Sequence, residues 1–434
     1  MRKYVRLERE FAGKPLILET GKLAHLATGA VTVTHGDQML LATATIGDAT
    51  DADFFPLTVD FLDKFYASGK IKGSRFIKRE GRPSETAILT SRLIDRPMRP
   101  MFPKGMRSAV QVMITMLSTD TENNAGPLAM TGVSSALLLG GFPFEGPVAG
   151  VRVGRVNGAL IINPSYKQLE EGDIELIVAG TADAVTMVEC GAKELSPEDI
   201  IVALEFAHTH IKQLCAIQME FVKECDAPKP LEYAEYKVPQ EVIEAVKGIV
   251  TDDMVETLYV GDKKEFAAAK KVIQTHVLES FSTERTRIEN SWKDADIKEA
   301  LEYFVRGKMR AGVLKTSRRL DGRKLDEVRT VSAEVGVLPR THGSGLFNRG
   351  ATQVMTVVTL GGPSDAQMID EMDTEYEKTY MHFYNFPPFS VGEAKGLRSP
   401  GRREIGHGML AEKALVPVLP PAEKFPYTML LVSE

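Results

Sequence analysis

The chain has 434 residues, of which 43% are hydrophobic and 26% charged, and its formal net charge is −6 at pH 7. This composition excludes a disordered or fibrous protein, and the length predicts two to three globular domains. The negative net charge excludes a general polycation that coats nucleic acid, so any polyanion site must come from local clustering of basic residues.

The first part of the chain mixes strand and helix patterns. Strands are expected at residues 16–20, 30–35, 38–45, 54–60, 110–116, 148–153, 159–162, 176–179 and 185–188. His35-Gly36-Asp37 is typical of a hairpin turn. A helix is expected to open at Ser84-Glu85 and to end before Pro97, and others to cover 127–139 and 196–225. This mixture predicts an α/β or α+β domain over residues 1–213.

Residues 214–310 predict an all-helical domain. Prolines mark its entry at Pro228, Pro230 and Pro239. Beyond them, residues 263–281 and 295–308 keep apolar positions at helical spacing with almost no strand pattern.

The third segment, residues 311–434, repeats features of the first. Glu19-Thr20-Gly21 lines up with Glu334-Val335-Gly336, and Gln38 lines up with Gln353. Each copy then has a strand, a basic loop, an Arg-Glu pair, an apolar helix and a Pro-x-x-Pro word. This comparison pairs Arg79-Glu80 with Arg403-Glu404, and Pro97–Pro100 with Pro417–Pro420. A duplicated domain is the simplest explanation.

A glycine-punctuated stretch from Ser399 to Gly408 holds Arg402, Arg403 and His407. Arginines at a strand-to-helix junction suit phosphate, because the planar guanidinium donates two parallel hydrogen bonds and the helix N–H groups add positive potential. The alternative for an isolated Arg-Arg-Glu is a solvated turn with a surface ion pair.

A second basic cluster runs from Lys70 to Arg99. By composition alone, its loop part is either a solvated loop or a track for RNA. Arg92, Arg96 and Arg99 lie with Asp95 on or just after the predicted helix and are expected to form ion pairs and interface contacts.

Other polar groups are given structural interpretations. Glu371, Asp373 and Glu375 are expected to be solvated surface. Ser134-Ser135 is expected to pack within a buried helix, with a vestigial phosphate pocket as the alternative. The three cysteines lack metal-site spacing, and their odd number argues against a disulfide framework. No run of about 18 apolar residues predicts a membrane span. The first residues do not resemble a secretory signal, because no apolar core follows them. The cysteine pattern fits a reduced, intracellular setting, and a cytoplasmic location is expected.

Several short sequence motifs, taken together, resemble those of polynucleotide phosphorylases, and they span nearly the whole length of the chain. The motifs that carry the resemblance are residues 1–10, Asp53–Val59, Arg79–Glu85, Arg92–Pro97, Leu320–Arg323, Gly336–Ser344, Tyr384–Glu393 and Phe425–Thr428.

The resemblance implies an α+β fold with duplicated ribonuclease PH-like cores, each a mixed sheet with helices, joined by an all-helical domain. It implies 3′-to-5′ phosphorolytic degradation of RNA in mRNA turnover. Inorganic phosphate is the co-substrate, nucleoside diphosphates are released, and the reaction is reversible. The expected partners are the 3′ end of single-stranded RNA, a homotrimeric ring, Mg²⁺ and RNA-degradation complexes, with no membrane.

The resemblance also assigns residues. Arg402 and Arg403 match the pair that grips phosphate in the second core, and His407 matches a histidine that contacts the 3′-terminal nucleotide or orders the loop. Phe76, Lys78, Arg79 and Arg82 match an RNA track in the first core. Ile77 replaces a family aromatic residue, which predicts stacking weaker by about 1–3 kcal/mol per base, to be tested by Ile77→Phe.

The family's serine-rich loop, metal-binding aspartates, and KH and S1 domains would follow Glu434. The metal ligands are therefore expected outside this chain, which resembles an N-terminal portion ending within the second core. The chain alone is expected to be inactive. The alternative function is a non-catalytic, ring-forming RNA-binding subunit of a ribonuclease PH-like assembly.

Overall fold

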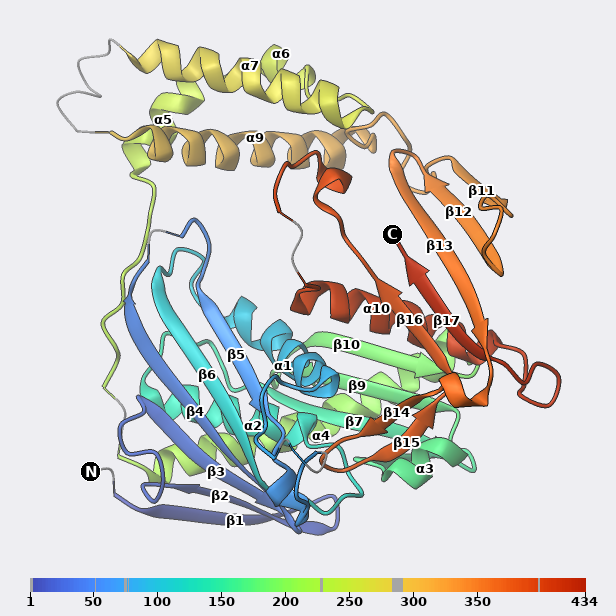
Figure 1. Cartoon of the computed structure of the whole chain (residues 1–434). Coiled ribbons are helices and arrows are strands. Elements are labelled where there is room, and N and C mark those ends of the chain that lie inside the picture. Colours follow the sequence, from blue (N-terminus) through green and yellow to red (C-terminus); the bar gives the residue numbers. More distant parts are fainter. Residues whose placement is uncertain are drawn as a thin grey trace. The chain divides into compact units, whose positions relative to one another are not determined.

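The structure is a computed structural model that describes residues 3–50, 52–73, 76, 78–226, 229–282, 292–396 and 399–434 (Figure 1). The chain forms two compact units. The first comprises Met1–Glu235 together with Val357–Glu434, and the second comprises Tyr236–Thr356. The predicted α+β class is confirmed, because mixed sheets are covered by helices.

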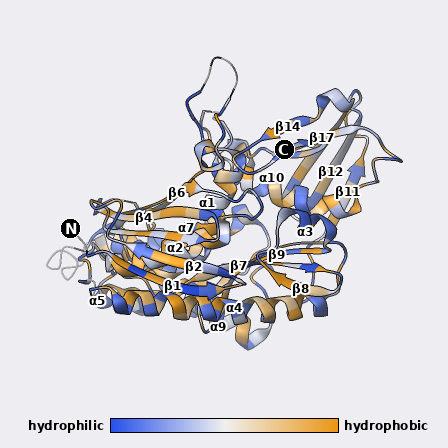
Figure 2. Cartoon of the chain, turned by 90° about the horizontal axis from the view of Figure 1, so that it is seen from below, coloured by the Kyte–Doolittle hydropathy of each residue, from blue (hydrophilic) through white to orange (hydrophobic). Residues whose placement is uncertain are grey.

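The first sheet of the first unit has six strands in the order β1-β2-β3-β4-β6-β5. Their bounds are β1 Val5–Phe11, β2 Lys14–Thr20, β3 Gly29–His35, β4 Gln38–Ala49, β5 Leu57–Leu62 and β6 Ser108–Ser118. Neighbours are antiparallel except β5 and β6, which run parallel because helix α1 (Glu85–Met98) connects them. Along β2 and β6 buried residues alternate with less buried ones, so one face of the sheet is more deeply buried, whereas the first five residues of β3 are all buried. Figure 2 shows the hydropathy of the strands.

The second sheet has the order β10-β9-β7-β8. Its strands are β7 Ala149–Val156, β8 Ala159–Ile162, β9 Ile174–Gly180 and β10 Val185–Ala192, with α3 (Tyr166–Glu171) between β8 and β9. Helix α2 (Gly126–Gly140) packs on β3 and β4 of the first sheet and on β7 of the second. Gly29 permits this packing, since a Cβ there would lie 1.9 Å from the Ala136 carbonyl oxygen.

Helix α4 (Pro197–Glu224) covers β7 and β9. Among the described helices it is the one that length and hydropathy would allow to cross a membrane. Ala207, Ile211 and Phe221 on α4 are buried in the core of the first unit, and core helices pass the same test. Helix α4 also continues past residue 213, so the packed first core extends beyond the predicted boundary.

The part of the first unit that follows residue 356 repeats a motif of the first sheet. Strand β16 (Tyr380–Tyr384) runs parallel to β17 (Thr428–Ser433), and α10 (Arg402–Leu415) connects them. This β16–α10–β17 motif has the same layout as β5–α1–β6. A hairpin of β14 (Gln367–Asp370) and β15 (Glu375–Lys378) precedes it.

The second unit contains helices α5 (Gln240–Ile249), α6 (Asp252–Glu256), α7 (Lys263–Ser282) and α9 (Asp294–Thr316). They share a separate hydrophobic cluster in which the rings of Phe281 and Trp292 meet edge to face at 5.9 Å. Strands β11 (Val331–Val335) and β12 (Gly343–Arg349) follow as an antiparallel pair. The boundary to the first unit falls within β13 (Thr352–Gly361).

Two sequence predictions about the helices are wrong. Helix α1 contains Pro97 in its last turn, where few helical hydrogen bonds remain to be lost. The Arg79-Glu80 and Arg403-Glu404 dipeptides are not structurally equivalent either. Glu80 lies in a loop before α1, whereas Arg403-Glu404 lies in the first turn of α10. The helices themselves correspond, so Pro100, not Pro97, matches Pro417; each is the second residue of the 3₁₀ turn that follows its helix.

Candidate functional site

The N-terminus of α10 is the centre of the candidate site. Gly401 precedes the helix, and the Glu404 carboxylate accepts a hydrogen bond from the Gly401 N–H at 3.0 Å. The capping contact begins the helix at Arg402. Helix N–H groups and the macrodipole therefore place partial positive charge beside Arg402 and Arg403, which favours an anionic ligand.

The two adjacent arginines differ in their contacts. Arg402 donates to the Val59 carbonyl oxygen at 2.7 Å and pairs with the Asp60 carboxylate, both on β5. Arg403 is exposed and makes no hydrogen bond or ion pair within the described part of the chain. Arg402 thus anchors α10 to the first core, while the Arg403 guanidinium keeps its donors available.

His407 lies one turn further along α10, beside aromatic rings. Its imidazole meets the Tyr384 ring at 5.2 Å in an edge-to-face arrangement, and Tyr384 stacks with Phe386 at 6.2 Å. Burial lowers the pKa of His407, and the positive charges of Arg403 and Arg92 lower it further. The imidazole is therefore neutral at pH 7, able to donate at one nitrogen and accept at the other.

Arg92 is a site residue that the sequence prediction missed. Arg96 pairs with Glu189 and Arg99 with Asp95, each at 2.9 Å, as expected. Arg92 makes no such pair among the described residues. Its side chain crosses Gly406 of α10, where a Cβ would lie 2.4 Å from the Arg92 Nε. A glycine inside a helix signals such a close approach, and Gly406 was the available clue.

The predicted RNA track lies in the loop before α1. Phe76 is 88% exposed, and Lys78, Arg79 and Arg82 are exposed as well. Ile77 lies outside the described residues. Glu80 fixes the end of the loop by accepting from Lys64 and from the Phe65 N–H. Burial alone would raise the pKa of Glu80, but these contacts outweigh it and leave that pKa lowered.

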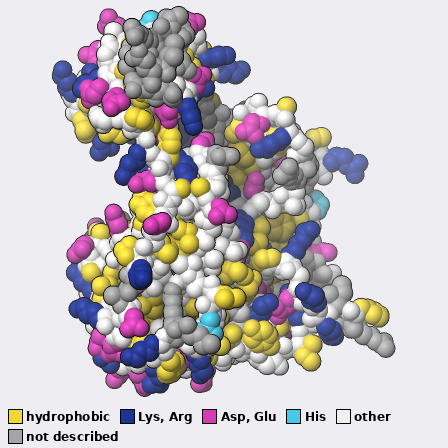
Figure 3. Space-filling model, turned by 90° about the vertical axis from the view of Figure 1, so that its left-hand side faces the viewer, with side chains coloured by type: hydrophobic (Ala, Val, Ile, Leu, Met, Phe, Trp, Pro, Cys, Tyr) yellow, Lys and Arg dark blue, Asp and Glu magenta, His cyan; other side chains and the backbone are white. Residues whose placement is uncertain are grey.

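The wider surface carries no broad basic patch on the side that Figure 3 shows. Lysine and arginine side chains are interspersed there with aspartate and glutamate. The net charge of −6 requires any site for a polyanion to come from a local cluster of basic residues.

The acidic run near residue 373 is not all solvated surface, contrary to the sequence prediction. Glu375 is exposed, but Glu371 and Asp373 are half-buried on the tip of the β14–β15 hairpin. The Tyr166 hydroxyl donates to Asp373 at 2.6 Å. Burial is the main cause that raises the pKa of both carboxyls.

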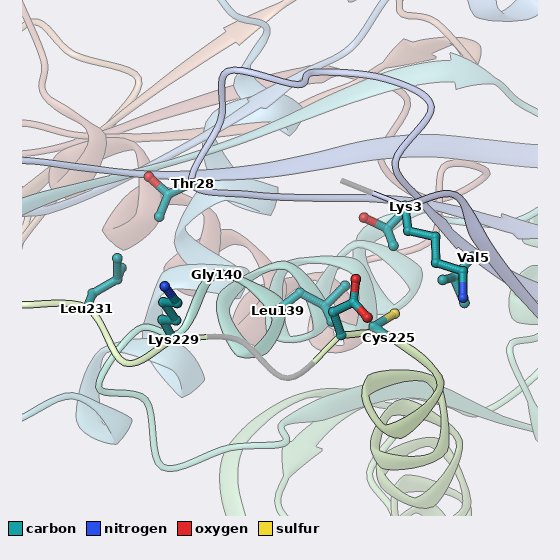
Figure 4. Close-up of a pocket in the computed structure, with 10 residues that line it drawn as sticks. Lys3, Val5, Thr28, Leu139, Gly140, Cys225, Lys229 and Leu231 are labelled. Atoms are coloured by element: carbon teal, nitrogen blue, oxygen red, sulfur yellow. The ribbon is translucent and has the colours of Figure 1, made fainter. Parts of the chain in front are cut away.

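Two larger hollows lie in the first unit. One, of about 350 Å³, is lined by Lys3, Val5, Thr28, Leu139, Cys225 and neighbours (Figure 4), and none of the predicted site residues lines it. The other, of about 550 Å³, lies between α1, β7, β9, β15 and α10. Arg152 on its wall is 8% exposed and pairs with Glu175, while its Nε and Nη1 lack partners in the described part of the chain.

Ser134 and Ser135 have the predicted packing role. Both are buried; Ser134 accepts from the Val148 N–H at 2.9 Å, and Ser135 donates to the Thr131 carbonyl at 2.8 Å. Among the described residues, no group of three or more His, Cys, Asp or Glu side chains could hold a metal ion.

Comparison with known proteins gives a consistent result. The model of the 3′ exoribonuclease family, domain 1, matches residues 12–143 and 327–433, and that of domain 2 matches residues 146–210. The polyribonucleotide nucleotidyltransferase RNA-binding domain matches residues 241–324. These matches confirm two ribonuclease PH-like regions that flank a helical one.

Curated relatives match nearly the whole chain. Polyribonucleotide nucleotidyltransferases of Herpetosiphon aurantiacus and Geobacillus kaustophilus are each 48% identical over 427 residues, which is 98% of this chain. The chain spans 55% and 58% of the lengths of these two relatives. A crystal structure of rice Rrp46 matches with a TM-score of 0.38 and 11% identity, covering 50% of this chain and 94% of that one.

Proposed function

The chain belongs to the 3′ exoribonuclease family, and we propose that it serves in 3′-to-5′ phosphorolytic degradation of RNA, with release of nucleoside diphosphates. The observation that carries this proposal is the N-terminal end of α10, where Arg403 is exposed, has no ion pair among the described residues, and lies close enough to His407 and Tyr384 to influence both electrostatically. Cationic donors for a phosphate and aromatic faces for a base meet at one place.

The geometry suggests a division of roles at this end of α10. Arg403 donates to phosphate oxygens, and the helix N–H groups add positive potential. Arg402, held by Asp60, fixes the first turn of the helix against β5. Tyr384 offers a ring face to the terminal base, and the neutral His407 imidazole orients a hydroxyl or phosphate oxygen. Phosphoryl transfer depends mainly on such positioning and charge stabilisation.

The exposed Phe76, Lys78, Arg79 and Arg82 are proposed to guide single-stranded RNA toward that site. Aromatic and cationic groups on one loop suit a strand bound by stacking and by phosphate contacts. The Lys72 ammonium lies 4.9 Å from the centre of the Phe65 ring at the base of the loop, which adds a further cation near the track.

Magnesium is implied by the family, where it supplies charge stabilisation at the transferred phosphate. The described residues do not fit such a site, because no suitable group of ligands lies together. The roles above therefore involve this chain's own side chains alone. A homotrimeric ring, RNA-degradation partners and a cytoplasmic location are likewise proposed from family membership.

The test measures the binding of inorganic phosphate and of a 3′-hydroxyl oligoadenylate to the chain. Arg403→Ala is expected to weaken phosphate binding by about tenfold or more, since a charge-assisted hydrogen bond contributes about 1.5–3 kcal/mol. Arg6→Ala, at an exposed arginine on β1, is the matched control. Unchanged phosphate affinity in Arg403→Ala would refute the proposed site. RNA binding without any phosphate binding would favour the non-catalytic, ring-forming subunit.

A further inference from the structure

Helices α1 and α10 are equivalent elements of the two cores. Each has 14 residues, and each leads into a three-residue 3₁₀ turn, Arg99–Met101 or Val416–Val418. Counting from the first helical residue, Thr86 therefore corresponds to Arg403, and Thr90 corresponds to His407.

The strands that precede these helices correspond in the same way. After β5 comes a 3₁₀ turn, Phe65–Ser68, closed by Gly69 at φ 71°; after β16 comes Pro388–Val391, closed by Gly392 at φ 73°. Phe61 therefore corresponds to Tyr384.

By the same count, Asp63 corresponds to Phe386. Four side chains of the candidate site around α10, those of Tyr384, Phe386, Arg403 and His407, thus have counterparts in the first core: Phe61, Asp63, Thr86 and Thr90.

These four first-core residues line one hollow, and the chain itself fills it. Glu371, Met372 and Asp373 from the hairpin tip lie against them. Met372 is 4% exposed and belongs to the hydrophobic core of the first unit. The space left over is about 20 Å³, room for about one water molecule and too little for a phosphate group.

Polar contacts hold the tip in place. Thr86, the counterpart of Arg403, lines the hollow together with Glu371, and its polar groups favour the charged form of that carboxyl. Tyr166 donates to the Asp373 carboxylate at 2.6 Å, and Lys70 Nζ donates to the Glu371 carbonyl oxygen at 3.4 Å. The tip also closes on itself through the Glu371 N–H and the Thr374 carbonyl oxygen at 2.9 Å.

We propose that the tip of the β14–β15 hairpin, as part of the same chain, fills the first-core hollow that corresponds to the candidate site of the second core. The tip places the Glu371 and Asp373 carboxylates where the second core would hold phosphate. It excludes phosphate and RNA ends from the first core and leaves the end of α10 as the open site of the pair. The comparison with phosphate rests on the proposed function; the occupancy of the hollow does not.

The packing of the hairpin tip in the first-core hollow should weaken as pH rises. The Glu371 carboxyl faces Thr86, Asp373 and Asp63, and the Asp373 carboxyl faces Tyr166, Asp63 and Lys70. Burial raises the pKa of both carboxyls, so the seated tip binds protons more tightly than the released tip. The packed position of the tip is therefore most stable at low pH, and it loses stability as pH rises through the raised pKa values of the two carboxyls.

Thiol accessibility tests the occupancy. Thr90→Cys places a thiol beneath the tip, and His407→Cys places one at the equivalent open position of α10. Thr90 is 7% exposed, whereas His407 is exposed. Alkylation by N-ethylmaleimide, read by peptide mass spectrometry so that the native cysteines do not interfere, is expected to be about 100-fold slower at position 90.

Replacing Glu371, Met372 and Asp373 by glycine is expected to raise the rate at position 90 by about tenfold or more, with little change at position 407. Tyr166→Phe, which removes a single hydroxyl from outside the tip, should raise it by a few-fold and guards against misfolding of the glycine variant. Continued protection of position 90 in both variants would overturn the proposal.

Adding inorganic phosphate to the alkylation experiment tests the proposed function separately from this inference. Inorganic phosphate is expected to slow alkylation at position 407, where Arg403 remains, and to leave position 90 unaffected while the tip is seated. A lack of phosphate protection at position 407 would count against the proposed function alone. The response of position 90 to the tip variants would still decide the occupancy.

Discussion

The N-termini of α1 and α10 present the same scaffold with opposite chemistry. Helix α1 begins with Glu85-Thr86, whereas α10 begins with Arg402-Arg403. Burial raises the pKa of Glu85, because a buried carboxyl is less stable in its charged form. A duplicated fold therefore repeats the position of a helix end without repeating what the end binds.

The surroundings enlarge the difference. At α1 the hairpin tip brings Glu371 and Asp373 into the hollow, while at α10 Arg403 is exposed and its charge acts on the nearby Tyr384. One end is occupied by acidic groups of the chain itself, and the other is open to an anion.

The largest expected effect comes from emptying the first-core hollow. Met372→Ala should lower the free energy of unfolding by about 2–4 kcal/mol, because it removes a buried side chain and leaves a cavity. Met368→Ala on the same hairpin is the control, since Met368 is 61% exposed and should cost less than about 0.5 kcal/mol. Urea denaturation of the chain measures both; equal losses would mean that the tip does not pack as described.

The next effect should appear at α10 alone. Arg403→Ala is expected to weaken phosphate binding by about 1.5–3 kcal/mol, whereas Thr86→Ala, at the equivalent position of α1, should leave it unchanged. Isothermal titration with inorganic phosphate compares the two variants. A loss of affinity in Thr86→Ala would show that both helix ends bind phosphate, and the contrast between the cores would fail.

A smaller effect concerns the buried charge at the tip. Asp373→Asn keeps an oxygen that accepts from Tyr166 but cannot ionise. Because burial raises the pKa of Asp373, its charge costs stability above that pKa. The variant should gain about 1 kcal/mol at pH 7 and almost nothing near pH 3, judged from urea midpoints. Glu375→Gln, at an exposed neighbour, should show no such pH dependence.

The smallest effect should be a shift in the titration of His407. Arg403 lowers the pKa of this imidazole, so Arg403→Ala should raise that pKa. Phosphate affinity in the parent should also rise as pH falls through that lowered pKa, because protonation adds positive charge. NMR titration of the imidazole protons measures the shift, and an unchanged pKa would mean that Arg403 points away from His407.

Much of the fold follows from local signals in the sequence. Alternating apolar residues predicted strands β2, β3 and β6, and Gly36-Asp37 predicted the two-residue hairpin between β3 and β4. The serine at the start of α1 is an N-cap, since Ser84 accepts from the Ala87 N–H at 2.9 Å. Such signals act within a few residues, so one chain suffices to recognise them.

The candidate site could be predicted only in part from such local signals. The glycine-flanked Arg402-Arg403 pair and the basic loop were recognisable by residue type, and their roles stay predictions. Repeat matching by short words failed at Arg79-Glu80, because a shared dipeptide says less about equivalence than a shared element does.

The sequence by itself thus determined the elements, the repeat and the basic residues near a helix start. The tertiary structure decided which charged side chains are paired or buried and which stay available to a ligand. Arg402 meets Asp60 across 342 residues, Asp373 meets Tyr166 across 207, and Arg92 passes over Gly406. Burial and pairing depend on groups brought together from distant parts of the chain, and these set both the charge of a carboxyl and the availability of a guanidinium.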